Sequence, residues 1–224
     1  KDLMQVYAPI DLYNENLRGL AKELGPVWVR VSGTWATKTY YDFDGTTGGK
    51  VPEGYLNVLT KEQWIGVLDF VKAIGAKLIV SVANCPGLHT AEEPWHPSEA
   101  EKLFSLSKEY GVPINAAEFT NEPNMMEETG FPKGYTPAHY RRDQDLFFTW
   151  LRKNYPDCIC VGPSTTGGDN ITFGKGSSDK QGGGIEQLMS NTCNCDDLLN
   201  GTTEPLDVFS YHYYNGVSER LASV

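Results

Sequence analysis

Five short apolar segments, rich in β-branched residues, alternate along the chain with helical patterns, and this alternation limits the possible folds. The predicted strands are 27–34, 77–84, 114–119, 158–162 and 207–214, and the predicted helices are 12–24, 61–74, 98–110 and 137–154. Strands that alternate with helices in this way are typical of a parallel α/β sheet. The segment 77–84 is continuously apolar, which indicates a strand buried on both faces.

Two of the predicted helices carry recognisable end signals. Gly75 follows the amphipathic stretch Lys61 to Ile74 and is a natural C-cap. Ser98 precedes the next helix and has Glu101 three residues later, which predicts an N-cap with a capping box. The Gly- and Ser-rich stretch 167–184 is expected to be a loop.

Polar residues gather where the predicted strands end, and this favours a barrel over an open sheet. No glycine-rich nucleotide-binding turn follows any strand. The polar strand ends are Ser32 and Thr34, Asn84, Asn121 and Glu122, 164–166 and 212–215. A (β/α)8 TIM barrel builds its active site at the carboxyl ends of its strands. We therefore predict this α/β fold.

Five strands are fewer than the eight that a closed barrel requires. Five parallel strands with two bare edges would make a poor independent domain. We therefore predict that residues 1–224 are one partial (β/α)8 catalytic barrel that carries the second to sixth strands. The remaining strands are expected on another segment or chain, a second polypeptide segment that completes the barrel.

Composition excludes some partners. The formal net charge of -10 argues against a nucleic-acid groove or a polybasic membrane patch. No stretch reaches the roughly 18 apolar residues of a membrane span. We expect no cofactor and no metal, because the pairs Cys158/Cys160 and Cys193/Cys195 lack the spacing of structural zinc sites.

The five cysteines and two glycosylation patterns bear on localisation. A disulfide that involves Cys193 or Cys195 is expected if the protein is secreted. Asn170 and Asn200 begin Asn-x-Thr patterns, which are short and often arise by chance. These features favour an extracellular, lumenal or lysosomal location.

Glu122 is the strongest catalytic candidate. It follows a buried strand within Thr120-Asn121-Glu122-Pro123, where its carboxyl group would project into the barrel mouth. A carboxylic acid that protonates a glycosidic oxygen must be held neutral, which partial burial beside a second carboxylate achieves. Asn121 is placed to hydrogen-bond a sugar hydroxyl. The alternative is a strand end with a solvated acid.

Seven segments follow one another in order over nearly the whole chain, namely 17–20, 25–34, 41–44, 78–84, 117–124, 161–163 and 211–216. Together they resemble glycoside hydrolase family 79, which contains heparanases, β-glucuronidases and the leech-type hyaluronidase. Asn-Glu-Pro alone is shared by many barrel glycosidases, whereas the ordered set is more specific.

The resemblance implies a retaining glycosidase that cleaves β-linked uronic-acid glycans or glycosides, in endo or exo fashion. Glu122 would be the general acid/base, and the nucleophile would be a glutamate at the end of the seventh barrel strand, outside this chain. Retention requires the two carboxyl groups to be about 5–5.5 Å apart. By the same resemblance, the residues that line the sugar site are Thr34, Asn84, Asn121 and Tyr213 or Tyr214.

Departures from the family pattern leave alternatives open. Ser32-Gly33-Thr34 stands where family members usually have Gly-Gly-Thr, and Phe119-Thr120 precedes Asn121 where they have Leu-Gly. The substrate could instead be a neutral sugar for another barrel glycosidase of the same clan. A non-catalytic carbohydrate-binding relative is the remaining alternative.

Secondary candidates have ordinary structural explanations. Glu118 would share a strand face with Glu122 and could be a buried partner for Arg30 or form a helix-facing salt bridge. His89 and His96 are expected to be solvated loop residues. Three aromatic residues could stack on sugar rings or pack in the core, namely Trp35, Tyr40 and Trp95.

Overall fold

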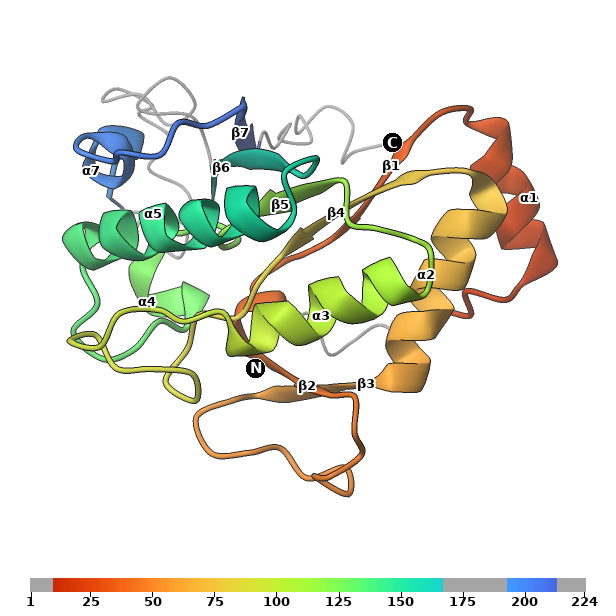
Figure 1. Cartoon of the computed structure of the whole chain (residues 1–224), viewed down its shortest axis with the longest axis horizontal. Helices are drawn as coiled ribbons and strands as arrows, with labels where there is room; N and C mark the ends of the chain where they lie inside the picture. Colours follow the sequence, from red (N-terminus) through yellow and green to blue (C-terminus); the bar gives the residue numbers. More distant parts are fainter. Residues whose placement is uncertain (1–9, 167–192, 213–224) are drawn as a thin grey trace, which may run out of the picture.

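The computed structural model describes residues 10–166 and 193–212 (Figure 1). Its main feature is a five-stranded parallel sheet in the order β1-β4-β5-β6-β7. The strands are β1 (Trp28–Val31), β4 (Lys77–Ser81), β5 (Ala116–Glu118), β6 (Ile159–Thr166) and β7 (Val208–His212). All five predicted strands are therefore present, and each neighbouring pair is parallel, as predicted.

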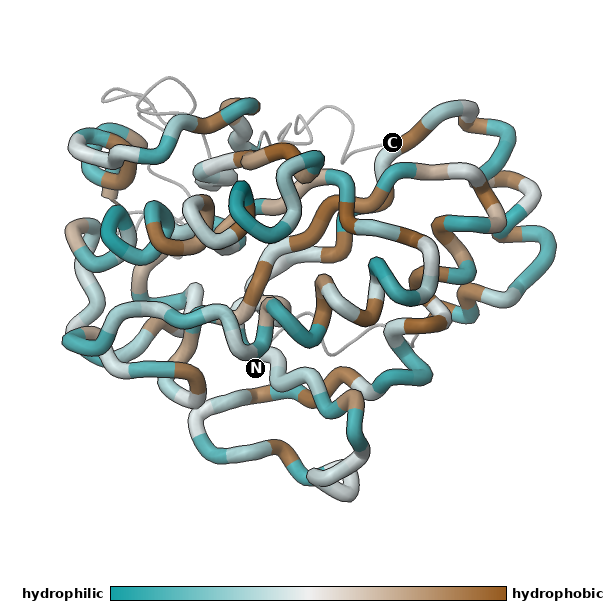
Figure 2. Tube along the Cα trace, viewed as in Figure 1, coloured by the Kyte–Doolittle hydropathy of each residue, from teal (hydrophilic) through white to brown (hydrophobic). Residues whose placement is uncertain are grey.

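The helices cover one face of this sheet. They are α1 (Glu15–Glu23), α2 (Lys61–Ile74), α3 (Ser98–Glu109), α5 (Pro137–Asn154) and the short α7 (Cys195–Leu199), while the short α4 (Met126–Thr129) belongs to the loop after β5. Helices α3 and α5 lie side by side in Figure 1, and Phe104 meets Trp150 edge-on at 5.3 Å between ring centroids. Figure 2 shows the apolar residues concentrated along the central strands and recurring along these helices.

Strand register explains which residues face the helices. Val31, Val80, Ala117 and Cys160 are aligned across β1, β4, β5 and β6, and all belong to the apolar core. Side chains alternate between the two faces of a sheet, so the intervening row points to the opposite, concave side. That row includes Glu118.

The sheet is strongly curled. In a flat sheet, β1 and β7 would be separated by four interstrand spacings, about 19 Å. Arg30 on β1 nevertheless brings its Nη2 atom to 3.2 Å from Nε2 of His212 on β7. Strand side chains stand roughly perpendicular to their sheet, so the two edges can meet only if the sheet curls into part of a barrel. This geometry agrees with a partial TIM-like barrel.

Helix ends follow local sequence in most places. Gly75 ends α2 with φ 69°, in the left-handed region expected for a glycine C-cap. The prediction for Ser98 is wrong: it is the first residue of α3, Pro97 occupies the N-cap, and no side chain caps this end. A residue inside the helix cannot supply the cap.

Several short elements were not predicted, among them α4 and α7. Strands β2 (Thr39–Asp42) and β3 (Asn57–Thr60) form a separate two-stranded parallel sheet. The short 3-10 helix η2 (Ala36–Lys38) leads into β2. The predicted loop 167–184 and Asn170 lie outside the described residues.

Candidate functional site

Glu122 lies just beyond β5 and is held in an uncommon backbone conformation. Its φ of 47° falls in the left-handed region, which glutamate rarely adopts. Its backbone N–H donates to the carbonyl of Ser164 on β6 at 3.1 Å. Its carbonyl accepts from Thr129 Oγ1 at 2.7 Å and from the Met125 N–H at 3.0 Å. Both backbone groups are therefore tied, and the surrounding structure fixes the direction of the side chain.

The carboxylate of Glu122 meets a histidine from the far edge of the sheet. Oε1 is 2.8 Å from Nδ1 of His212, and the two side chains are only 15% and 21% exposed respectively. His212 was recognised in the sequence as a strand-end polar residue, but its pairing with Glu122 was not predicted. The two residues are separated by 90 positions in the sequence, and the strand order β5-β6-β7 brings them to the same group of strand ends.

Arg30 and Glu118 form the floor of the same site. Arg30 Nε lies 3.1 Å from both carboxylate oxygens of Glu118, and Nη2 lies 2.8 Å from Oε2. Of the two alternatives left open for Glu118, the pairing with Arg30 is the one present. Glu118 is 3% exposed, so this guanidinium supplies the opposite charge that a buried carboxylate requires.

Asn121 is drawn into the same network. Its Oδ1 accepts from Arg30 Nη2 at 2.9 Å, and its Nδ2 makes a long 3.5 Å contact with Thr34 Oγ1. The structure thus brings three of the predicted site residues, Glu122, Asn121 and Thr34, to one group of strand ends. Tyr213 and Tyr214 lie outside the described residues.

Asn84 occupies a different environment from the other predicted sugar ligands. It is fully buried, with Oδ1 2.6 Å from His89 Nε2 and Nδ2 donating to the hydroxyl of Tyr135 at 3.2 Å. The Tyr135 hydroxyl donates to Asp143 Oδ2 at 2.7 Å. Burial, together with the nearby Asp143 carboxylate, raises the pKa of Tyr135 well above its ordinary value and keeps it a neutral donor. Both ends of the Asn84 side chain are engaged in this chain of hydrogen bonds.

The loop after β4 corrects one prediction and confirms another. His89 is only 4% exposed, so the expectation of a solvated His89 is wrong. Both of its ring nitrogens have protein partners: Nε2 bonds Asn84, and Nδ1 lies 2.9 Å from the Glu93 carbonyl oxygen. His96 is exposed, as expected. Trp95 is a core residue, 4% exposed, with its ring edge-on to Phe119.

All five cysteines are free thiols, and the disulfide expected for a secreted protein at Cys193 or Cys195 is not present. Cys158 and Cys160 are buried, and burial raises the pKa of each thiol to about 12. Among the described residues, no group of three or more His, Cys, Asp or Glu side chains is arranged to hold a metal ion. The helices of the described regions include none that is long and apolar enough to cross a membrane.

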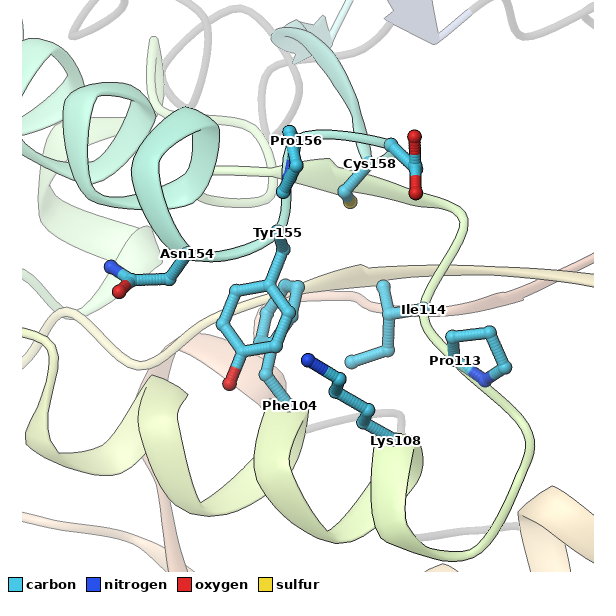
Figure 3. A pocket seen from close by; sticks show the side chains of 9 residues that line it. Phe104, Lys108, Pro113, Ile114, Asn154, Tyr155, Pro156 and Cys158 are labelled. Carbon is cyan, nitrogen blue, oxygen red and sulfur yellow. The ribbon is translucent and has the colours of Figure 1, made fainter.

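A hollow of about 300 Å³ lies at the opposite ends of the strands (Figure 3). Its apolar wall comes from Phe104 of α3 and from Ile114 and Cys158, which precede β5 and β6. Lys108 and Asp157 supply its charges. In barrels this amino-terminal end serves stability, and the chemistry takes place at the carboxyl ends. The candidate active site is therefore the group around Glu122.

Comparison with known proteins adds a distant likeness in fold. No protein-family model and no curated protein matches the chain. Cel44A, a family 44 endoglucanase from Clostridium thermocellum, superimposes with a TM-score of 0.46 at 14% identity, over 83% of this chain and 48% of that one. N2152 from Neocallimastix frontalis gives 0.37 at 13% identity, over 83% and 47%.

The chain spans about half the length of both structures. A distant structural neighbour is thus a glycoside hydrolase, whereas membership of family 79 specifically is not supported. At these scores the likeness carries no functional argument, so the argument rests on the geometry of the site.

Proposed function

We propose that this chain carries the acid/base half of the active site of a retaining glycoside hydrolase. The observation that carries the proposal is the position of Glu122, at the carboxyl end of a strand on the concave side of a curled parallel sheet, where it is fixed by its backbone and by His212. That is where a barrel enzyme places its catalytic groups. A partly buried carboxyl group there suits proton transfer to and from a glycosidic oxygen.

The proposed reaction has two steps. Protonated Glu122 gives its proton to the leaving oxygen as the glycosidic bond breaks, and a second carboxylate bonds to the anomeric carbon. Glu122, now ionised, removes a proton from water; the water oxygen bonds to that carbon and releases the second carboxylate. The configuration of the anomeric carbon is retained.

The second carboxylate is proposed to come from outside the described residues, at the end of the barrel strand that would follow β7. Glu118 is unsuited to the role because both of its carboxylate oxygens are already engaged: Arg30 donates three hydrogen bonds to them, and Oε2 also accepts from Ser32 Oγ.

Additional strands are proposed to pair with the two open edges of the sheet and complete the barrel. Parallel sheets are normally covered on both faces, yet both edge strands expose large apolar side chains. Trp28 on β1 is 46% exposed, and Val208 and Phe209 on β7 are 46% and 55% exposed. Intact mass of the purified active protein would test this, because the completing segment must be present as one longer chain or as a second polypeptide.

For the substrate, we propose a β-linked uronic acid, on the strength of the ordered family 79 motifs. Asn121 and Thr34 would contact the sugar: Arg30 bonds the Asn121 oxygen, and the amide nitrogen, whose contact with Thr34 Oγ1 is a long 3.5 Å, would donate to a hydroxyl. Tyr213 and Tyr214 are proposed to line the same site. Asn84, being fully buried, is proposed to act by supporting the loop at 85–97.

The test is hydrolysis of matched aryl β-D-glucuronides and β-D-glucosides by protein produced from the complete gene. Each sugar is offered with an activated leaving group and with a poor one, because an activated phenolate needs little help from an acid. Glu122→Gln is expected to lower kcat/KM by roughly 10²- to 10⁴-fold on the poor leaving group. It should have much less effect on bond cleavage with the activated one. Glu127→Gln, at an exposed position on the adjacent helix α4, is the matched control.

The outcomes separate the alternatives. Turnover of glucuronides in preference to glucosides supports the uronate proposal, and the reverse preference moves the substrate to neutral sugars. An equal loss on both leaving groups would contradict an acid role for Glu122. No turnover on any sugar, with binding retained, would overturn catalysis in favour of a carbohydrate-binding protein.

A further inference from the structure

A chain of hydrogen bonds joins the buried Glu118 to Glu122 through Arg30 and His212. Arg30 Nη2 contacts Glu118 Oε2 at 2.8 Å and His212 Nε2 at 3.2 Å. His212 Nδ1 in turn contacts Glu122 Oε1 at 2.8 Å. The four residues come from β1, the loop after β5, the end of β5 and β7, so the chain of bonds crosses the whole concave side.

The direction of each hydrogen bond follows from what each group can do. A guanidinium can only donate, so Nε2 of His212 must accept and carries no proton. A neutral imidazole that accepts at one ring nitrogen carries its proton on the other. Nδ1 therefore carries the proton and donates to Oε1 of Glu122, which can accept both when the carboxyl group is ionised and when its proton is on Oε2. The other tautomer would set the Nε2–H against a donor of Arg30 and satisfy neither group.

We propose that Arg30 is a positioning residue that fixes His212 in its Nδ1–H tautomer, so that His212 orients the carboxylate of Glu122. The inference rests on the proposed function of Glu122, although the tautomer itself can be read without any activity. The guanidinium is held for this task by the buried Glu118, whose Oε2 also accepts from Ser32 Oγ at 3.3 Å, and by Oδ1 of Asn121 at 2.9 Å. Arg30 thereby acts on the carboxylate through His212.

The variants must remove the donor without leaving a buried charge unpaired. Arg30→Met alone would strand the carboxylate of Glu118, so it is combined with Glu118→Gln, which places a neutral amide at the same site. Glu118→Gln alone is the matched control, because it keeps Arg30 and its bond to His212. Circular dichroism and denaturant unfolding of both variants establish that the comparison is made between folded proteins.

The first measurement is the tautomer of His212 in protein labelled with ¹⁵N-histidine, where protonated and unprotonated ring nitrogens have well-separated shifts. Signals of His212 are assigned as those missing from His212→Asn. We expect Nδ1–H in the wild type and in Glu118→Gln, and loss of that preference in the double variant. Nε2–H in the wild type, or an unchanged tautomer in the double variant, would overturn the proposal. An inactive protein still gives this reading, so failure of the proposed function is distinguishable.

The second measurement asks whether Arg30 works only through His212. An asparagine at 212 places its amide nitrogen near the position of Nδ1, where it can donate to Glu122 whether or not Arg30 is present. A glutamine would instead reach toward the position of Nε2. With His212 present, adding Arg30→Met to Glu118→Gln is expected to lower kcat/KM for a poor leaving group by about 10- to 100-fold, the range for one hydrogen bond to a charged group. With His212→Asn the same addition should change it by less than about threefold. An equal loss in both backgrounds would show that Arg30 does not act through the tautomer.

Discussion

Tyr135→Phe is expected to destabilise the protein, because the tyrosine hydroxyl is the link between two buried polar groups. It donates to Asp143 Oδ2 at 2.7 Å and accepts from Asn84 Nδ2 at 3.2 Å. Asn84 and Asp143 are both fully buried, so water cannot readily replace the missing hydroxyl. Phenylalanine fits the same space and removes only the oxygen.

The magnitude follows from what each partner loses. Asp143 Oδ2 keeps a bond from Arg142 Nη2 at 3.0 Å, and Oδ1 keeps the Trp95 N–H at 3.1 Å, so the carboxylate loses one of several donors. The Asn84 amide nitrogen loses the acceptor to which it donates. A buried group left unsatisfied costs about 1–3 kcal/mol, so the sum is estimated at about 2–4 kcal/mol. The Asn84–His89 pair at the end of β4 should loosen with it.

Urea unfolding followed by tryptophan fluorescence measures the change in free energy of unfolding. Tyr13→Phe is the matched control: Tyr13 donates to Asp69 at 2.8 Å, but it is 55% exposed and water replaces the bond, so the change should stay within about 0.5 kcal/mol. If Tyr135→Phe lowered the free energy of unfolding no more than Tyr13→Phe does, it would refute the reasoning that the buried groups of Asn84 and Asp143 depend on the Tyr135 hydroxyl.

Three further changes test other parts of the structure. Thr129→Val removes the 2.7 Å hydrogen bond to the Glu122 carbonyl and should lower kcat several-fold with little change in KM. Thr129→Ser keeps the hydroxyl and should retain activity. Steady-state kinetics measure both variants, and an equal loss in the two would contradict the hydrogen-bond role. Burial raises the pKa of Cys158 to about 12, so its thiol stays protonated at pH 8. It should therefore react with iodoacetamide at least about tenfold more slowly in the native than in the unfolded protein. Mass spectrometry measures the two rates, and equal rates would refute the prediction. Gly75→Ala should lower the free energy of unfolding by about 1 kcal/mol, because φ at this position is 69°. Gly19→Ala lies inside α1 with no atom within 4 Å of the added carbon, and should raise the free energy of unfolding by about 0.5–1 kcal/mol. Thermal or urea unfolding measures both changes, and changes of the same sign would contradict the predictions.

Local sequence was sufficient to predict the elements, and the reason is visible in particular residues. The helix 137–154 was predicted with its observed bounds because Pro137 starts it and its apolar period is regular. Strand β4 was predicted from a continuous apolar run; Leu78 and Val80 are buried on its helix-facing side, whereas Ile79 on the other side is only partly buried. By contrast, β2 and β3 are short and make a separate two-stranded sheet, so no long periodic pattern marks them.

Contacts across the curled sheet were harder to predict. For Glu118 the sequence left two partners open, Arg30 and a helix-facing salt bridge, and only the structure selects Arg30. His212 could not be assigned to Glu122, because nothing in a sequence states how far a sheet curls or which strands face each other across it. The solvated His89 was mispredicted for a related reason: its partner Asn84 was expected to face a sugar, and instead it turns into the loop.

The same guanidinium serves stability and chemistry, and this determines how loss of activity at Arg30 must be interpreted. Arg30 neutralises a carboxylate that is 3% exposed, so its removal alone would destabilise the sheet whether or not it has any part in catalysis. A fall in activity in that single variant would therefore not distinguish the two roles. The paired change with Glu118 removes the electrostatic penalty, and the tautomer of His212 reports on the remaining contact alone. Two results together would separate the role of Arg30 in orienting Glu122 from its role in the fold. In the Glu118→Gln background, Arg30→Met should change both the tautomer of His212 and the rate. In the presence of His212→Asn, the same change should leave the rate nearly unaltered.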